Sequence, residues 1–401
     1  MTPPDIFSPE FARDPYPFYR IMRDEFPLYL HPGANAYVLS RYDDVREAVT
    51  NPEFTTRSYA AQIEPILGVT IVQLDGRDHA RQRRLLAAPF RPDRFQPEFG
   101  PVIAALADRL IASFKNRGEV EFIGEFISPF AVGALATVVG LPQSDIDRFR
   151  KWYTALLRFG VNLIGDPEVT AAGFAARDEL DAYLRPLVAE RRRSAGPGLL
   201  SMLAHVELEG QQLTDDEIVR FGMLMIFAGG ETVEKTLATF VRNLVAHPEQ
   251  LSALQAERAL MDRALAESLR YTAPTHMIPR KTRADLAVSG GTIPAEAEVI
   301  CFLGSANRDD RRFAGPDKYD MQRADLDTER AFTSAANHAA FGGGRHFCLG
   351  AVMAKTEVEI AVNRLLDSAA GLRFAGEPPT DEGLFLRGPR KLPLEFTPAQ
   401  H

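Results

Sequence analysis

The chain has 401 residues, of which 46 are lysine or arginine and 54 are aspartate or glutamate, so its net charge is -8. This acidic balance argues against nucleic acid or an anionic membrane as the main partner. Hydrophobic residues at 45% and charged residues at 25% are ordinary for a globular protein, and a chain of this length can bury a large core around an interior cavity.

Cys301 and Cys348 are the only cysteines, which excludes a disulfide framework and suits a reducing cytosol. Residues 1–11 have neither a basic start nor an apolar stretch, so they do not form a signal peptide. No segment approaches the ~18 uncharged apolar residues of a transmembrane helix. We therefore expect a cytoplasmic protein without a membrane anchor.

Helical periodicity dominates the chain, and extended runs are short and scattered. Gly290 and Gly291, followed by Pro294, indicate a turn between two short strands. Residues 191–198 (RRRSAGPG) predict a surface loop within one domain that spans residues 1–401. The pattern predicts a mainly α fold with a small β region. Three further runs are typical of strands: Ala36–Ser40, Val299–Leu303 and Leu392–Phe396.

One long helix is predicted from Thr214 to His247, where Pro248 ends it. It opens with a Thr-Asp-Asp-Glu capping box and would be roughly 50 Å long at about 1.5 Å per residue. Gly229 and Gly230 lie in its middle, and each costs about 1 kcal/mol relative to alanine. They permit either close helix packing or the approach of a flat group, and the residues alone leave both readings open.

The segment Phe341–Gly350 (FGGGRHFCLG) carries the clearest chemistry. Its glycines allow left-handed backbone, so several peptide N–H groups can surround one atom. Cys348 precedes a predicted helix, Ala351–Leu366, whose positive end favours a thiolate. A phosphate loop and a buried structural cysteine are alternatives, although the Lys-Ser/Thr of a Walker motif is absent. A zinc site is disfavoured because no second cysteine lies nearby.

Residues 341–351 resemble the haem-binding loop of the cytochrome P450 family, the haem-thiolate monooxygenases. Three other segments resemble motifs of that family in the same order, so the match runs from about residue 14 to residue 396. The resemblance implies a mainly α, triangular-prism fold with haem between the long central helix and the Cys-loop helix. The three segments are His79–Arg83 (haem-gripping helix), Ala228–Thr232 (oxygen-activating motif) and Glu267–Arg270 (Glu-x-x-Arg).

The resemblance implies that Cys348 is the axial ligand of the iron of haem b, a thiolate that favours O–O cleavage. Phe341 would shield this ligand from water. Arginine and histidine side chains would hold the two propionates, and His79 and Arg83 lie four residues apart on one helix face. The implied cofactor contacts are His79, Arg83, Ala228, Gly229, Arg280, Phe341, His346, Cys348 and Gly350.

Glu231 and Thr232 are the expected catalytic pair, because a carboxylate beside an alcohol can relay protons through water. Glu267 and Arg270 are expected to form a buried structural ion pair. Candidate substrate contacts, for which plain core packing is the alternative, are the loop at residues 58–70 and Met225, Ala228, Thr275, His276, Met277, Ile278 and Phe385.

A basic cluster surrounds the His79 helix, with only Asp78 and Asp93 as local acids. It is either a solvated face or a docking surface for an acidic ferredoxin. No flavin or reductase segment is evident, so ferredoxin and ferredoxin reductase are expected to supply electrons from NAD(P)H. The cluster consists of Arg77, Arg81, Arg83, Arg84, Arg91 and Arg94.

The expected reaction is O2-dependent hydroxylation or epoxidation of a hydrophobic small molecule, an intermediate of natural-product biosynthesis. A peroxide-driven or rearranging haem-thiolate enzyme and a non-catalytic haem sensor are the alternatives. The presence of both Glu231 and Thr232 favours the dioxygen route, because peroxide brings its own protons.

Overall fold

The structure is a computed structural model that describes residues 2–160, 162 and 165–398. The chain divides into two compact units, each of which has its own packing. The first unit comprises Met1–Thr55, Ala107–Ser128 and Thr232–His401, and the second comprises Thr56–Leu106 and Pro129–Glu231. Three segments distant in sequence therefore build the first unit.

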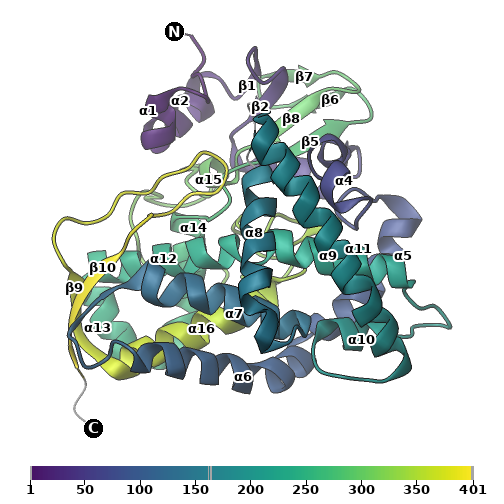
Figure 1. The fold of residues 1–401 in the computed structure, drawn as a ribbon. Coiled ribbons are helices and arrows are strands. Elements are labelled where there is room, and N and C mark those ends of the chain that lie inside the picture. Colours follow the sequence, from purple (N-terminus) through teal and green to yellow (C-terminus); the bar gives the residue numbers. More distant parts are fainter. Residues whose placement is uncertain (1, 161, 163–164, 399–401) are drawn as a thin grey trace. The chain divides into compact units, whose positions relative to one another are not determined.

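The first unit contains a five-stranded sheet in the order β1-β2-β8-β5-β3 (Figure 1). Its strands pair antiparallel except for β2 and β8, which run parallel with Tyr37 opposite Val299. The strands predicted at Ala36–Ser40 and Val299–Leu303 are thus confirmed. The strand bounds are β1 Leu28–His31, β2 Ala36–Leu39, β3 Phe54–Thr55, β5 Ile278–Thr282 and β8 Glu298–Cys301.

Two smaller sheets complete the β structure of the described residues. The first is antiparallel in the order β4-β10-β9, and β10 confirms the strand predicted at Leu392–Phe396. The second is a hairpin whose turn includes Gly290 with φ +89°, as its glycine pair predicts. The bounds are β4 Glu119–Glu121, β6 Leu286–Val288, β7 Gly291–Ile293, β9 Ala369–Phe374 and β10 Pro393–Pro398.

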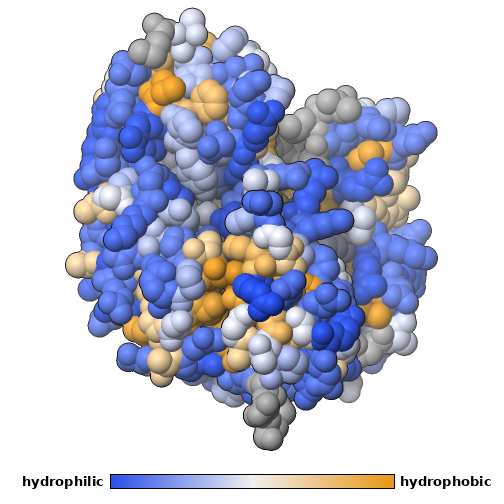
Figure 2. Space-filling model, turned by 90° about the vertical axis from the view of Figure 1, so that its left-hand side faces the viewer, coloured by the Kyte–Doolittle hydropathy of each residue, from blue (hydrophilic) through white to orange (hydrophobic). Residues whose placement is uncertain are grey.

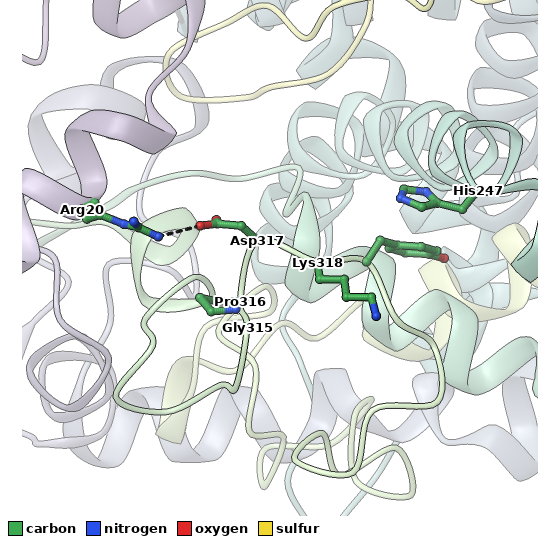
Figure 3. A pocket seen from close by; sticks show the side chains of 7 residues that line it. Arg20, His247, Gly315, Pro316, Asp317 and Lys318 are labelled. Carbon is green, nitrogen blue, oxygen red and sulfur yellow. Dashed lines mark hydrogen bonds and ion pairs between the residues drawn. The ribbon is translucent and has the colours of Figure 1, made fainter.

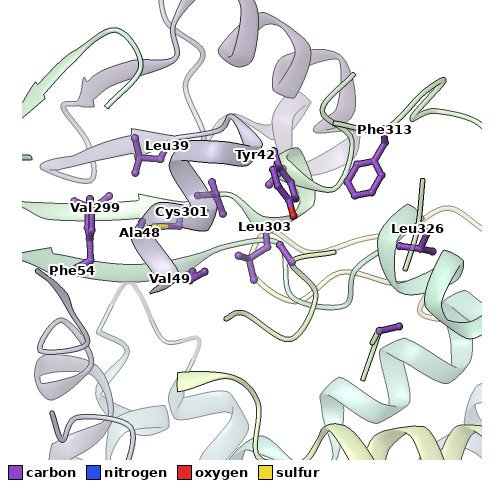
Figure 4. Packing of buried hydrophobic residues seen from close by; sticks show 14 of the residues in the cluster. Leu39, Tyr42, Ala48, Val49, Phe54, Val299, Cys301, Leu303, Phe313 and Leu326 are labelled. Atoms are coloured by element: carbon purple, nitrogen blue, oxygen red, sulfur yellow. The ribbon is translucent and has the colours of Figure 1, made fainter. Parts of the chain in front are cut away.

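The helices of the first unit cover its main sheet and carry the Cys348 loop. Figure 4 shows a buried cluster of this unit that includes Ala48 and Val49 of α3 and Val299 and Cys301 of β8. The helices are α1 Pro9–Arg13, α2 Tyr16–Glu25, α3 Tyr42–Thr50, α12 Glu231–Ala246, α13 Pro248–Ala256, α14 Met261–Tyr271, α15 Leu303–Ala306 and α16 Ala351–Ser368. Short 3₁₀ turns lie at Arg258–Leu260 and Gly344–His346, and a π turn lies at Ile123–Ile127.

The described part of the second unit is helical, and α9 packs against α8, α10 and α11 (Figure 1). Residues 58–70, predicted as a loop, contain helix α4, and α9 continues to Arg193, so the predicted 191–198 loop is shorter. The helices are α4 Tyr59–Leu67, α5 Gly76–Ala87, α6 Pro92–Ala112, α7 Ser128–Val139, α8 Ile146–Gly160, α9 Pro167–Arg193, α10 Leu199–His205 and α11 Asp215–Ala228, with 3₁₀ turns at Ala88–Phe90 and Gln143–Asp145.

The predicted long helix is interrupted, and it forms α11 and α12 with Gly229 and Gly230 between them. The capping box at Thr214 is present with both of its hydrogen bonds. A Cβ atom on Gly229 would lie 3.0 Å from Leu135 Cδ1, and one on Gly230 would lie 2.5 Å from the hydroxyl oxygen of Tyr153. Close packing by these two side chains therefore explains the glycines within this unit.

On the face drawn in Figure 2, hydrophilic residues predominate, and apolar residues form smaller groups among them. Among the described residues, no helix combines the length and the apolar character needed to cross a membrane.

Candidate functional site

The Cys348 loop is closed by its own backbone, because the Cys348 N–H donates to the Phe341 carbonyl oxygen at 2.9 Å. Gly342 and Gly344 adopt φ values of +69° and +58°. Residues with a Cβ atom rarely adopt this left-handed conformation, whereas glycine does so readily. A Cβ atom on Gly344 would lie 2.7 Å from the carbonyl oxygen of Val49, so the loop rests directly on α3. Conformation therefore favours glycine at both positions, and at Gly344 the lack of space requires it as well.

The thiol of Cys348 is exposed and lies at the start of α16. Gly350 is the N-cap residue of that helix and has no side chain to cap it. A Cβ atom on Gly350 would lie 3.9 Å from the Cys348 sulfur. The partial positive charge at the N-terminus of an 18-residue helix stabilises a thiolate there. The geometry thus presents an exposed sulfur just before a helix N-terminus.

The second cysteine has the opposite environment. Cys301 lies in β8, is fully buried, and burial raises the pKa of its thiol to about 12. A thiol with that pKa stays protonated at neutral pH and is a poor metal ligand. Of the two cysteines, only Cys348 therefore suits coordination.

Aromatic rings pack behind the cysteine. The Phe341 ring lies 5.9 Å from Phe347, 6.2 Å from Phe332 and 6.0 Å from the imidazole of His338, measured between ring centroids. Burial lowers the pKa of His338 to about 4, so this ring is neutral at pH 7. The sequence interpretation missed His338, whose only signal was its position three residues before Phe341. The predicted shield at Phe341 is thus one ring of an aromatic group.

Arg280 is a buried guanidinium in β5. It donates to the Pro279 carbonyl oxygen at 2.8 Å, and no carboxylate among residues 2–160, 162 and 165–398 forms an ion pair with it. A buried cation without a counter-charge is costly, so this position suits an anionic group of a ligand. Arg345, in contrast, donates to the carbonyl oxygens of Pro52 and Phe54, which hold its charge against β3.

His79 and Arg83 lie in α5 of the second unit, where His79 is buried and Arg83 half-buried. Their spacing places both on one face of the helix, as predicted. His346 lies in the 3₁₀ turn just before Cys348 and is also half-buried. Each of these three residues is thus at least partly withdrawn from solvent.

The basic cluster around α5 is less basic than its sequence indicates. Arg81 forms an ion pair with Glu217, and Arg84 forms one with Glu209 at 3.1 Å. Arg91 pairs with its neighbour Asp93 at 3.1 Å. The prediction considered only local acids, and it missed the two glutamates because they lie more than a hundred residues away in the sequence.

Glu231 and Thr232 form the first turn of α12, directly after the glycine pair, and both are half-buried. The Thr232 carbonyl oxygen accepts the hydroxyl of Thr236 at 2.7 Å. Ala228, the last residue of α11, is exposed, whereas Met225 one turn earlier is buried. The acid and the alcohol thus follow the break in the helix.

Glu267 and Arg270 form the predicted ion pair, and both side chains are fully buried. The Arg270 guanidinium donates to both carboxylate oxygens at 2.7 and 2.8 Å. It also donates to the carbonyl oxygens of Asn307 and Pro316, each at 2.9 Å. The pair therefore ties α14 to the segment that follows α15.

Two of the predicted substrate segments, Thr275–Ile278 and Phe385, meet in the first unit, where the His276 N–H donates to the Phe385 carbonyl oxygen at 2.9 Å. The His276 side chain, however, is buried with its Nδ1 atom 2.7 Å from the Tyr19 hydroxyl. Met277 is buried in the same N-terminal cluster. Both side chains thus pack in the core, which is the alternative that the sequence left open for them. Thr275, Ile278 and Phe385 are half-buried.

Two surface pockets lie in the first unit, and neither is lined by a predicted site residue. The first, of about 430 Å³, is drawn in Figure 3, where Arg20 pairs with Asp317 at 3.0 Å near one end and His247 lies near the other. The second, of about 620 Å³, shares Arg20 and Asp317 with the first. Neither lining includes a residue of the Cys348 loop.

The family profile described as Cytochrome P450 matches residues 149–369. Pulcherriminic acid synthase of Bacillus subtilis is 34% identical over 394 residues, which cover 98% of this chain and 97% of that protein. The chain belongs to the cytochrome P450 family. Cytochrome P450 monooxygenase PikC of Streptomyces venezuelae is 29% identical, and the alignment covers 96% of this P450 and 92% of PikC.

Solved P450 structures have the same fold. Cytochrome P450 CYP109Q5 from Chondromyces apiculatus superimposes with a TM-score of 0.88 at 28% identity and covers 99% of each chain. CalO2 superimposes with a TM-score of 0.88 at 29% identity and covers 100% of each chain. The predicted mainly α P450 fold is therefore confirmed.

A P450 is a haem-dependent monooxygenase, and the residues of this chain fit that cofactor. Cys348 presents an exposed sulfur at a helix N-terminus, as a thiolate ligand requires. The buried guanidinium of Arg280, which donates to the neutral carbonyl oxygen of Pro279, suits a haem propionate.

Proposed function

We propose that this P450 hydroxylates or epoxidises a hydrophobic small molecule of natural-product biosynthesis, with haem b and with electrons from a ferredoxin and its reductase. The exposed thiol of Cys348 at the N-terminus of α16 carries the proposal. Relatives named pulcherriminic acid synthase and a P450 of the bacillaene polyketide synthase support the substrate class. A cytoplasmic location belongs to the same proposal, because two cysteines without a disulfide suit a reducing compartment.

The bound haem supplies the activation of dioxygen and the transfer of one oxygen atom to the substrate. Cys348 binds the iron as thiolate, and the Phe341 ring excludes water from the sulfur. Ala228, Gly229 and Gly350 are proposed to lie against the flat ring. The small side chain of Ala228 and the absence of one at Gly350 leave room for it, whereas Leu135 fills the space beside Gly229. The side chains of His79, Arg83, Arg280 and His346 would hold the propionates.

Glu231 and Thr232 deliver protons in this proposal. One oxygen atom enters the substrate and the other leaves as water, and forming that water consumes protons that must cross an otherwise apolar site, so a defined donor accelerates the reaction. The Glu231 carboxylate takes protons from solvent, and the Thr232 hydroxyl holds a water and passes the proton on. Their place on the first turn of α12 keeps both backbone positions rigid.

The substrate pocket is proposed to include Met225, Ala228, Thr275, Ile278 and Phe385. Apolar side chains predominate in this set, which favours a hydrophobic substrate. Ala228 is exposed, and Thr275, Ile278 and Phe385 are half-buried, so each retains surface that a ligand can contact.

The ferredoxin is proposed to dock on the basic cluster around α5. Arg77 and Arg94 are exposed there, although Glu209 and Glu217 offset part of the positive charge. Steering by opposite charges weakens as salt is added. Turnover with a ferredoxin should therefore slow as ionic strength rises, and a rate independent of salt would contradict docking on this cluster.

Cys348→Ser tests the haem assignment, with Cys301→Ser as the matched control. We expect the reduced, carbon monoxide-bound wild type and Cys301→Ser to show the red-shifted Soret band of thiolate ligation, because Cys301 is buried in β8. Cys348→Ser should lose this band. Retention of the band without the Cys348 sulfur would overturn the assignment.

Turnover assays separate the three modes of action. The proposal requires product formation with ferredoxin, reductase, NAD(P)H and O2. A peroxide-driven enzyme would form product from peroxide without NAD(P)H, a rearranging enzyme would need neither, and a sensor would form none with any of these supplies.

A further inference from the structure

The ring of Tyr153 lies directly against Gly230. Tyr153 is in α8, is 7% exposed, and belongs to the same unit as Gly230 and Glu231. A Cβ atom on Gly230 would lie 2.5 Å from the Tyr153 hydroxyl oxygen and 2.7 Å from Cε2 and Cζ of its ring. Only glycine therefore permits this approach, and the polar end of the ring makes the nearest contact.

The contact with Gly230 limits how far the hydroxyl can lie from the next residue, Glu231. With a bond of about 1.5 Å from Cα to that Cβ position, the hydroxyl oxygen lies within about 4 Å of the Gly230 Cα atom. The Glu231 Cα atom is about 3.8 Å further along the chain. A glutamate side chain can bridge that separation directly or through one water.

The break between α11 and α12 is held in place around this hydroxyl. The Phe149 ring stacks on Tyr153 with an interplanar angle of 16° and a centroid distance of 6.4 Å. The Leu135 side chain of α7 packs against Gly229, where a Cβ atom would lie 3.0 Å from it. The tyrosine ring thus has little freedom to move away from the glycine pair.

Packing alone does not explain a tyrosine at this position. Phenylalanine would fill the same space, whereas a buried hydroxyl loses water and needs a hydrogen bond to offset that loss. A phenol remains protonated at neutral pH and can donate to a carboxylate without neutralising it. Such a bond orients the carboxylate and favours its ionised form.

We propose that the Tyr153 hydroxyl is a positioning group that orients the Glu231 carboxylate for proton delivery. This inference rests on the proposed function of Glu231. The hydroxyl donates to the carboxylate directly or through one water, and it leaves the carboxylate able to take protons from solvent and pass them to Thr232.

Tyr153→Phe tests the inference because it keeps the ring and removes only the hydroxyl. The matched control is Tyr183→Phe, which removes a hydroxyl that donates to Asp145 at 2.6 Å in the same unit. We expect Tyr153→Phe to bind haem and substrate as wild type does but to form several-fold less product per NADH consumed. The acidic limb of its pH profile should move to higher pH, since the ionised carboxylate loses a donor. The control should match wild type in both measurements.

Infrared spectroscopy of the resting protein gives a readout that does not depend on turnover. The carboxyl band of Glu231 is identified as the one missing from Glu231→Gln. We expect this band to shift in Tyr153→Phe and to stay in place in Tyr183→Phe. An unshifted band together with an unchanged pH profile in Tyr153→Phe would overturn the inference.

Glu231→Gln separates the two hypotheses. If it leaves product per NADH unchanged, the proposed function of Glu231 fails, and the inference fails with it. If Glu231→Gln lowers product per NADH while Tyr153→Phe does not, only the inference fails. Equal losses from Tyr153→Phe in the wild-type and Glu231→Gln backgrounds would show that the tyrosine acts independently, which also overturns it.

Gly230→Ala provides a second variant in case Tyr153→Phe does not fold. The added methyl group displaces the hydroxyl while the phenol remains. It should lower product per NADH as Tyr153→Phe does, and a wild-type ratio in a haem-loaded Gly230→Ala protein would count against the inference.

Discussion

The guanidinium of Arg270 meets the carboxylate of Glu267 in two hydrogen bonds of 2.7 and 2.8 Å, and neither side chain is exposed. The same guanidinium donates to the carbonyl oxygens of Asn307, Pro316 and Lys318, so one side chain satisfies backbone groups at three further positions. Burial lowers the pKa of Arg270, and the bonds to Glu267 oppose this effect. The pair therefore organises the segment after α15 rather than performing chemistry.

Breaking this pair should strongly destabilise the fold. Arg270→Ala leaves the Glu267 carboxylate buried without its main partner, and we expect a loss of roughly 3–5 kcal/mol in the free energy of unfolding. Urea denaturation measures this loss. Arg20→Ala is the control: Arg20 and Asp317 also lie 3.0 Å apart, but their side chains are 60% and 53% exposed. Such a pair contributes about 1 kcal/mol at most. Equal losses from both variants would contradict a structural role for the buried pair.

Gly344→Ala should disrupt the haem loop. Gly344 has φ +58°, and a Cβ atom would lie 2.7 Å from the Val49 carbonyl oxygen. Gly315→Ala is a close control because Gly315 has φ +55° with nothing within 4 Å of its would-be Cβ atom. We expect Gly344→Ala to bind several-fold less haem per chain and Gly315→Ala to bind the wild-type amount, as measured by absorbance. Equal haem content in both would show that the contact with Val49 is unimportant.

Thr232→Ala should uncouple the reaction. We expect the variant to retain haem and substrate binding. Without the Thr232 hydroxyl proton delivery is impaired, so NADH electrons are diverted to peroxide. Product and peroxide per NADH consumed measure this diversion. Thr236→Ala, one turn along α12, removes a hydroxyl that is bonded to the Thr232 carbonyl oxygen and should stay coupled. An unchanged product ratio in Thr232→Ala would refute the role.

The buried imidazole of His276 should make the protein less stable in acid. Burial, together with the charges of Arg387 and Arg308, lowers the pKa of His276 to about 3, below the ~6.5 of an exposed histidine. Its contribution is complete above about pH 6.5 and declines as pH falls toward 3, because the unfolded chain binds one more proton in that window. The free energy of unfolding should fall by about 1.4 kcal/mol per pH unit from this one group.

His276→Gln should reduce that slope by about 1.4 kcal/mol per pH unit, which corresponds to the uptake of one proton on unfolding. Unfolding measured at a series of pH values would show this change. Tyr19→Phe removes the hydroxyl 2.7 Å from Nδ1 but leaves the imidazole buried, so its slope should remain. The same slope in wild type and His276→Gln would contradict the assignment.

The features that the sequence predicted well are those encoded by neighbouring residues. The turn at Gly290, the strand at Ala36–Leu39 and the capping box at Thr214 each depend on a few consecutive residues. The Cys348 loop is of the same kind, because its glycines and the helix that follows it determine the position of the sulfur. Backbone conformation and contacts within one helical turn can be read from such short patterns.

Tertiary structure decided the features that depend on distant residues. The predicted long helix is broken at its glycines, where Leu135 and Tyr153 approach from other helices. Glu217 offsets the charge of Arg81, and Tyr19 brings the ring of His276 into the core. These pairs are separated by about 75 to 260 positions, and no local pattern specifies which distant side chain will fill a given space. Packing density and charge compensation become defined only when the whole chain has folded.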